Sequence, residues 1–257
     1  MENTNHNYGR IGEKCSNGAS RVWRLIESSS KSNGKEIEKI SIESIPEDRY
    51  DEAVDFLCKY YIADEPLCQS RNINNDLVAL EDFRREWRET LEEGISVGAF
   101  SMGENLSKPE LVGLNVLYIG TKAVDAKEME KKTFNSTKAK ELIEMFVRVR
   151  DATDIYKKYE TDIYLGAIGL CVHPHYRGLG LAKYMLDART KIGQELGIPV
   201  TVTIFTGPLS QMAAERAGFE VLFERRYDQM LDDNGEIMYP VKGSKMIKVM
   251  GKKFESK

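Results

Sequence analysis

A short glycine-bearing run between an apolar strand and an amphipathic helix constrains this chain more than any other feature. The run is Tyr176-Arg177-Gly178-Leu179-Gly180-Leu181-Ala182. Residues 162–172 before it read as a buried strand, and apolar residues recur at helical spacing over 181–196 after it. Such a turn leaves backbone N–H groups at the positive end of a helix dipole, where diphosphate commonly binds. Because Arg177 adds a permanent cation, the sequence predicts that this turn binds a pyrophosphate group.

Charge and cysteine content narrow the classes of partner. The 257 residues include 37 Lys and Arg against 41 Asp and Glu, a net charge of −4, so the basic surface that nucleic-acid binding needs is not indicated. The four cysteines show neither a CxxC pair nor a disulfide-framework spacing, which favours a reducing compartment. No apolar run approaches the ~18 residues of a membrane helix. We expect a cytoplasmic protein, a monomer or weak homodimer, that binds neither nucleic acid nor membrane.

Composition divides the chain into a tail and one domain. Residues 1–35 are rich in Asn, Ser, Gly and Lys and are expected to form a flexible N-terminal tail, although the run 22–26 can dock or form a short strand. Residues 36–257 are long enough for one domain with a sizeable core. Apolar periodicity there predicts the order β-α-α-β-β-α-β-α-β-α-β-β, which describes a mixed α/β sheet.

Local signals predict several element boundaries. Ser44 and Glu47 form a capping-box pair that opens a helix ending near residue 63. One long helix is expected to carry apolar residues from 142 to 159, and residues 234–235 (Asn-Gly) predict a type I′ turn in a C-terminal hairpin. A second helix is expected to run through Leu77, Leu80, Phe83, Trp87 and Leu91.

The turn and its flanking elements carry a family resemblance. Arg177, Gly180 and Ala182 meet the pattern Arg/Gln-x-x-Gly-x-Gly/Ala, and after one more strand a short helix ends in residues 217–219 (Ala-Gly-Phe). In this combination the chain resembles the GNAT superfamily of acetyl-CoA-dependent N-acetyltransferases over residues 36–252. The resemblance implies an α/β GNAT fold: a mixed, mostly antiparallel central sheet flanked by helices, whose splayed strands hold the pantetheine arm of CoA.

The same resemblance implies acetyl-CoA as co-substrate and assigns residues to its two halves. Backbone groups at the end of the preceding strand would bind the pantetheine, and the turn would hold the diphosphate. The residues so assigned are Leu170, Cys171, Val172, Arg177, Gly178, Leu179, Gly180, Leu181 and Ala182.

A narrower resemblance is to the insect-type arylalkylamine N-acetyltransferases. They share the stretch 64–67 (Asp-Glu-Pro-Leu) and a turn like that of residues 175–182. The resemblance implies that Glu65 is the general base and that Ser210 and Thr206 serve catalysis, although the family has serine where this chain has Thr206. Ala214 stands where many other GNAT enzymes place a tyrosine as general acid, so a tyrosine-based mechanism is not expected.

Each candidate residue also has a plain structural interpretation. Glu65 can be a surface or capping carboxylate, and Thr206 and Ser210 can cap the short helix that follows. Arg177 can be an ordinary surface residue. Cys171 is more simply a buried strand cysteine than the carrier of an acyl-cysteine intermediate.

The chemistry of acyl transfer to an amine assigns the expected roles. A protonated amine must lose a proton, and Glu65 would accept it through a water molecule. The hydroxyls of Ser210 and Thr206 would position the thioester or relay a proton rather than act as acids. The competing dinucleotide fingerprint fails because Lys183 occupies its third glycine position. With three histidines and no His/Cys cluster, a metal site is not expected.

The sequence therefore predicts an N-acetyltransferase that moves an acetyl group from acetyl-CoA to a small primary amine. The narrower resemblance implies an arylalkylamine such as dopamine, tyramine or serotonin. Three alternatives stay open: transfer to a polyamine or another aliphatic amine, use of a longer-chain acyl-CoA, and a non-catalytic acyl-CoA-binding sensor of the same fold.

Overall fold

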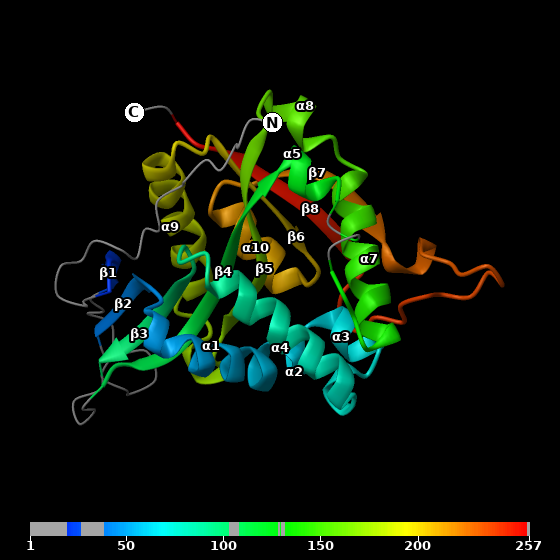
Figure 1. Cartoon of the computed structure of the whole chain (residues 1–257), viewed down its shortest axis with the longest axis horizontal. Helices are drawn as coiled ribbons and strands as arrows, with labels where there is room; N and C mark the ends of the chain where they lie inside the picture. Colours follow the sequence, from blue (N-terminus) through cyan, green and yellow to red (C-terminus); the bar gives the residue numbers. More distant parts are fainter. Residues whose placement is uncertain (1–19, 27–38, 103–107, 128, 130–131, 256–257) are drawn as a thin grey trace.

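The computed structural model describes residues 20–26, 39–102, 108–127, 129 and 132–255. They form one eight-stranded sheet in the order β1-β2-β3-β4-β5-β6-β8-β7, in which only the β5–β6 neighbours run parallel (Figure 1). The strands are β1 (Val22–Ile26), β2 (Lys39–Ser44), β3 (Val97–Met102), β4 (Glu110–Thr121), β5 (Ile163–Val172), β6 (Val200–Phe205), β7 (Glu220–Arg226) and β8 (Met246–Lys253).

Helices cover both faces of the sheet and enclose two main cores. One core joins α1, α4, α7 and α8 to the sheet, and the other joins α9 to strands β1–β5. The α-helices are α1 (Tyr50–Phe56), α2 (Ile62–Asp64), α3 (Pro66–Ser70), α4 (Leu77–Leu91), α5 (Lys122–Asp125), α7 (Thr137–Asp151), α8 (Ile155–Tyr159), α9 (Leu181–Leu196) and α10 (Pro208–Arg216). A π-helical segment, η3 (Leu57–Tyr61), makes α1 and α2 continuous, and the 3-10 helices are η2 (Glu47–Arg49), η4 (Ile73–Asn75), η5 (Pro174–Tyr176) and η6 (Tyr227–Gln229).

The two central strands β5 and β6 diverge almost as soon as they meet. Leu165 opposite Thr201 is their one paired position in the described sheet, and the Thr201 hydroxyl donates to the Leu165 carbonyl at 2.7 Å. Arg189 of α9 is fully buried at this point and donates to Asn115 on β4 and Thr203 on β6. It therefore ties together the strands on either side of β5. The predicted α/β fold, a mostly antiparallel sheet with splayed strands, is confirmed.

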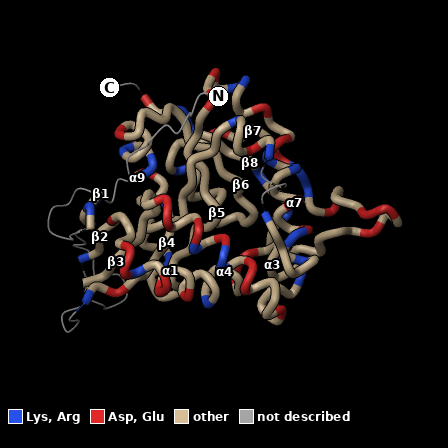
Figure 2. The backbone as a smooth tube through the Cα atoms, viewed as in Figure 1, with Lys and Arg blue, Asp and Glu red and all other residues tan. Residues whose placement is uncertain are grey.

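Part of the predicted tail joins the sheet. Residues 22–26 form β1, which pairs with β2 and buries Trp23. The remainder of the stretch 1–35, apart from residues 20–21, lies outside the described residues. Figure 2 shows Lys and Arg interspersed with Asp and Glu along the described chain. Among the described residues, no helix is both long and apolar enough to cross a membrane.

The predicted capping box at Ser44 and Glu47 is wrong. Ser44 is the last residue of β2, and its hydroxyl accepts a hydrogen bond from the indole N–H of Trp23 at 3.0 Å. Helix η2 instead begins after Pro46, and no described side chain caps it. Trp23, 21 positions earlier in the chain, therefore binds the hydroxyl that the capping-box pattern assigns to the helix start.

The single long helix predicted through Tyr159 is two helices. The first, α7, ends at Asp151, and α8 begins after Asp154. The carboxylate of Asp154 accepts the backbone N–H of Lys157 at 3.0 Å and so caps a new helix start. Asp is a strong N-cap residue, which explains the break.

The buried face of α4 includes Phe83, Trp87 and Leu91 of the predicted run, but Leu77 is not part of it. Leu77 is 80% exposed, whereas Asp82 and Glu86 are buried. The Asp82 carboxylate accepts the backbone N–H groups of Asn135 and Ser136, at 2.9 and 2.7 Å, just before α7 begins. Acidic side chains on this face therefore hold the connection that precedes α7 against α4.

The C-terminal hairpin forms, but its turn differs from the predicted type. Strands β7 and β8 pair antiparallel, and their long connection projects from the body of the molecule (Figure 1). At its tip the N–H of Gly235 donates to the Asp232 carbonyl, and Gly235 has a φ of +81°. A type I′ turn needs a positive φ at Asn234 as well, and Asn234 has none in the described backbone.

Candidate active site

A cleft of about 520 Å³ opens where β5 and β6 diverge. Its walls come from the α2–α3 junction, the end of β5, the turn before α9, and α10. The predicted site residues among its lining are Glu65, Leu170, Cys171, Val172, Arg177, Gly178, Gly180, Leu181, Ala182, Thr206 and Ser210. Leu179 instead packs against the core beneath α9.

The turn before α9 has the geometry of an anion-binding loop. Gly178 and Gly180 adopt φ values of +86° and +77°, which only glycine takes without strain. Gly180 is the N-cap of α9, and no described side chain caps the helix start, so its first N–H groups open onto the cleft. This arrangement fits a diphosphate.

Arg177 lies at the mouth of the cleft. Its Nε donates to the Val172 carbonyl at 3.1 Å, and its Nη2 forms an ion pair with Asp64 at the end of α2. Both charged side chains are partly exposed, so the pair can rearrange when an anion approaches. The guanidinium is thus held beside the turn rather than extended into solvent.

Glu65 is buried at the junction between α2 and α3. Its Oε2 accepts the backbone N–H of Cys68 at 2.5 Å and caps α3. Its Oε1 is also buried and has no hydrogen-bond partner among the described residues. An unpaired buried oxygen costs about 1–3 kcal/mol, so such an atom points to a functional demand. The Glu65 side chain therefore both caps α3 and lines the cleft, and one of its two carboxylate oxygens has no described hydrogen-bond partner.

The two candidate hydroxyls lie at the start of α10. Gly207, not Thr206, is the N-cap of this helix, and no described side chain caps it, so the capping interpretation of Thr206 is wrong. The Thr206 carbonyl accepts the Tyr227 hydroxyl at 2.9 Å. The Ser210 hydroxyl donates to the Gly207 carbonyl at 2.9 Å, which leaves its oxygen able to accept a further hydrogen bond.

Cys171 lines the cleft from β5, yet its buried environment disfavours ionisation of its thiol to the thiolate. Burial raises the pKa of the Cys171 thiol to about 12, and Arg177 offsets only part of this shift. The thiolate, not the thiol, is the nucleophile in acyl transfer. Cys171 is therefore an unreactive wall residue near neutral pH.

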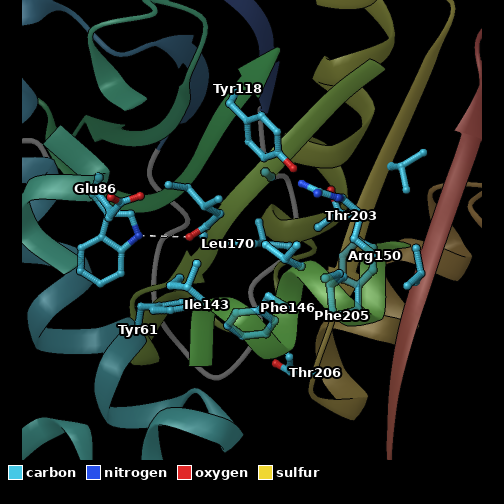
Figure 3. A pocket seen from close by; sticks show the side chains of 18 of the residues that line it. Tyr61, Glu86, Tyr118, Ile143, Phe146, Arg150, Leu170, Thr203, Phe205 and Thr206 are labelled. Atoms are coloured by element: carbon cyan, nitrogen blue, oxygen red, sulfur yellow. Dashed lines mark hydrogen bonds between the residues drawn. The ribbon is translucent and has the colours of Figure 1, made fainter. Parts of the chain in front are cut away.

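A second cavity, which we call the inner pocket, lies on the α4–α7 side of the same strands. It measures about 140 Å³, and Tyr61, Leu170, Thr206 and Ser210 line both it and the cleft. Figure 3 shows the inner pocket with the Tyr118 hydroxyl pointing into it. Its aromatic lining consists of Tyr61, Phe83, Trp87, Tyr118, Phe146, Tyr164 and Phe205.

Three charged side chains line the inner pocket, and the sequence had not marked any of them. Glu86 and Arg150 lie on opposite sides (Figure 3), and Lys132 pairs with Glu86 at 2.8 Å. Arg150 pairs with Asp125 at 3.2 Å, and the Asp125 carboxylate also accepts the Tyr164 hydroxyl at 3.0 Å. The sequence feature that could have indicated a buried charge here is the acidic residue at position 86, which lies between Phe83 and Trp87 on an apolar helix face.

Solved structures resemble the chain, whereas no sequence-family model and no curated protein matches it. A candidate arylalkylamine N-acetyltransferase 7 from the mosquito Aedes aegypti is 29% identical with a TM-score of 0.82, covering 92% of this chain and 96% of that one. Arylalkylamine N-acetyltransferase 2 from the same mosquito is 22% identical with a TM-score of 0.73 (84% and 99% covered). A polyamine N-acetyltransferase from Drosophila melanogaster is 18% identical with a TM-score of 0.70 (84% and 100% covered).

Proposed function

We propose that this chain, an acyltransferase of GNAT fold, moves an acetyl group from acetyl-CoA to a small primary amine, and that the amine is an arylalkylamine. One observation carries the proposal: the cleft with the anion-binding turn and the inner pocket share a wall at Tyr61, Leu170, Thr206 and Ser210. A thioester laid in the cleft and an amine held in the inner pocket would meet at this wall, close to Glu65.

The cleft residues account for binding of the CoA portion. Acetyl-CoA supplies an activated acetyl thioester when bound. The N–H groups at the start of α9 and the Arg177 guanidinium would hold its diphosphate. The divergence of β6 frees one side of β5, so the backbone of residues 170–172 is available to the pantetheine arm.

Glu65 would remove the proton that the amine must lose. One carboxylate oxygen stays fixed by the Cys68 N–H, which holds the side chain in place, while Oε1 is available as proton acceptor. Transfer through a water or directly requires only hydrogen-bond reach. With the thiol of Cys171 kept protonated, the amine would attack the thioester directly. Its nitrogen bonds to the acetyl carbon as the C–S bond breaks, and the second excess amine proton passes to the departing sulfur, so that CoA leaves as the thiol.

The inner pocket supports an aromatic acceptor. Tyr61 and Trp87 meet edge to face with ring centroids 5.8 Å apart, and Phe83 stacks on Trp87 at 5.6 Å. The Trp87 indole N–H donates to the Ile168 carbonyl at 3.1 Å and fixes this wall. A largely apolar pocket with few polar groups is typical of small-molecule sites.

The test is release of CoA from acetyl-CoA against a panel of amines. We expect turnover of tyramine, dopamine or serotonin. Turnover of decanoyl-CoA ahead of acetyl-CoA would favour the longer-chain alternative. CoA binding with no turnover of any amine would refute the proposal and identify a sensor.

A further inference from the structure

The described lining of the inner pocket includes one carboxylate, that of Glu86, and the ammonium group of Lys132 pairs with it. Glu86 projects from α4 and is 8% exposed, so its charge is largely removed from water. The Nζ of Lys132 lies 2.8 Å from its Oε2, and Lys132 itself lines the pocket. A buried carboxylate requires such a partner because an isolated charge in a low-dielectric site is costly.

The opposite side of the pocket also carries a positive charge, which repels the second ammonium group of a diamine. The Arg150 guanidinium lines it, and the carboxylates of Asp125 and Asp151 that pair with Arg150, at 3.2 and 2.9 Å, are not among the described lining residues. The reacting amine would lie at the wall shared with the cleft, so only the far end of a substrate reaches deeper into the inner pocket. A second ammonium group at that far end would meet two cations and one carboxylate that already has a partner.

We propose that Lys132 is a specificity-determining residue that makes the inner pocket select monoamines and reject diamines. Its ammonium group occupies the place against Glu86 that the second ammonium of a diamine would take. The inference rests on the proposed function and deepens it by naming the substrate class: amines whose far end is uncharged. A diamine is thus disfavoured because its second ammonium group would lose its hydration and find no free carboxylate in return.

The inference predicts a gain of function. Lys132→Met keeps the aliphatic stem and removes the charge, which uncovers the Glu86 carboxylate for a diamine. We measure kcat/KM for tyramine and for 1,5-diaminopentane, and calorimetric affinity of CoA-loaded protein for both. In Lys132→Met the diamine should gain on tyramine by roughly 10-fold or more in both readouts, as a charged hydrogen bond would give.

Two further variants test whether the change in the diamine-to-tyramine ratio depends on the Glu86–Lys132 pair. The double variant Lys132→Met/Glu86→Gln should lose the gain of the diamine over tyramine, because the pocket then has no carboxylate to pair with the second ammonium group. Lys138→Met should match wild type, since Lys138 is a partly exposed lysine that pairs with Asp76 at 3.7 Å outside the described pocket lining. Thermal unfolding verifies that each variant is folded.

The outcomes separate this inference from the proposed function. If wild type acetylates tyramine but Lys132→Met leaves the diamine-to-tyramine ratio unchanged, the inference alone is overturned. The same holds if wild type binds the diamine more tightly than tyramine. If wild type acetylates no amine, the proposed function fails, and the calorimetric ratio still decides the role of Lys132.

Discussion

The carboxylate of Glu65 and the backbone N–H of Cys68 form a 2.5 Å hydrogen bond that uses one of the two carboxylate oxygens. The other oxygen is buried and has no hydrogen-bond partner in the described structure. The same side chain therefore caps a helix and presents an unpaired oxygen beside the cleft. The two roles can be separated by substitution.

Replacing Glu65 by Gln should abolish base function and preserve the cap. The Gln amide oxygen can still accept the Cys68 N–H, so the free energy of unfolding should change by less than about 1 kcal/mol. Without a proton acceptor, kcat should fall roughly 10²- to 10³-fold while acetyl-CoA affinity stays unchanged. Steady-state kinetics and calorimetry measure these values, and Glu92→Gln, at the exposed end of α4, is the control. Full activity in Glu65→Gln would eliminate Glu65 as the base.

Gly180→Val should prevent acetyl-CoA binding because it places a branched side chain in the turn that lines the cleft. Both Gly180 and Gly197 have positive φ, at the two ends of α9, so valine strains the backbone at either position. Gly197→Val is therefore a matched control that should lose stability but keep CoA affinity. Calorimetric titration with CoA distinguishes them, and equal affinities in the two variants would remove the turn from the binding site.

Arg177→Ala should weaken acetyl-CoA binding in a salt-dependent way. The guanidinium is partly exposed, so we expect a loss of roughly 10-fold at low ionic strength that shrinks as salt approaches about 1 M, where the Debye length is about 3 Å. Arg226→Ala removes an exposed arginine that pairs with Asp228, and it should leave CoA affinity unaltered. A salt-independent loss in Arg177→Ala would indicate a structural role instead.

Cys171 should be inert at neutral pH and dispensable for transfer. Because its thiol pKa is about 12, alkylation by iodoacetamide at about pH 8 should be roughly 10³-fold slower than that of a free thiol, whose pKa is near 8.5. The folded protein keeps this proton above pH 8.5 while the unfolded chain loses it. The contribution of Cys171 to stability is therefore intact below that pH and declines up to about pH 12.

Chemical denaturation of wild type and Cys171→Ala across this pH range measures that decline. Initial-rate patterns with both substrates should intersect, as a ternary complex requires. Parallel lines, or an acetyl group on Cys171 detected by mass spectrometry, would establish the covalent route instead.

Features encoded by neighbouring residues could be predicted from the sequence. The turn before α9 follows from glycines set between an apolar strand and an amphipathic helix, and the structure places this turn in the cleft. Glu65, Thr206 and Ser210 came from motif positions, and all three line the same cleft. Local spacing was sufficient for the turn, whereas the family resemblance, not spacing, implied the roles of Glu65, Thr206 and Ser210.

Features that depend on contacts distant in sequence could not be predicted. The Ser44 hydroxyl accepts the indole N–H of Trp23, and the Glu86–Lys132 pair depends on residues 132–136 lying against α4. The burial of Asp82 on α4 depends on the N–H groups that its carboxylate accepts from residues 135–136. None of these partners has a fixed spacing that periodicity could detect.

The single paired position between β5 and β6 gives the sheet an edge in its own interior. Beyond Leu165, amides of β5 that face β6 lack a ladder partner in the described sheet, so they should exchange their hydrogens for deuterium as fast as those of an outer strand. A pantetheine chain laid along this edge would slow that exchange. Deuterium uptake by the peptide that contains residues 166–172 would therefore report occupancy of the cleft without any turnover and before the acceptor amine is known.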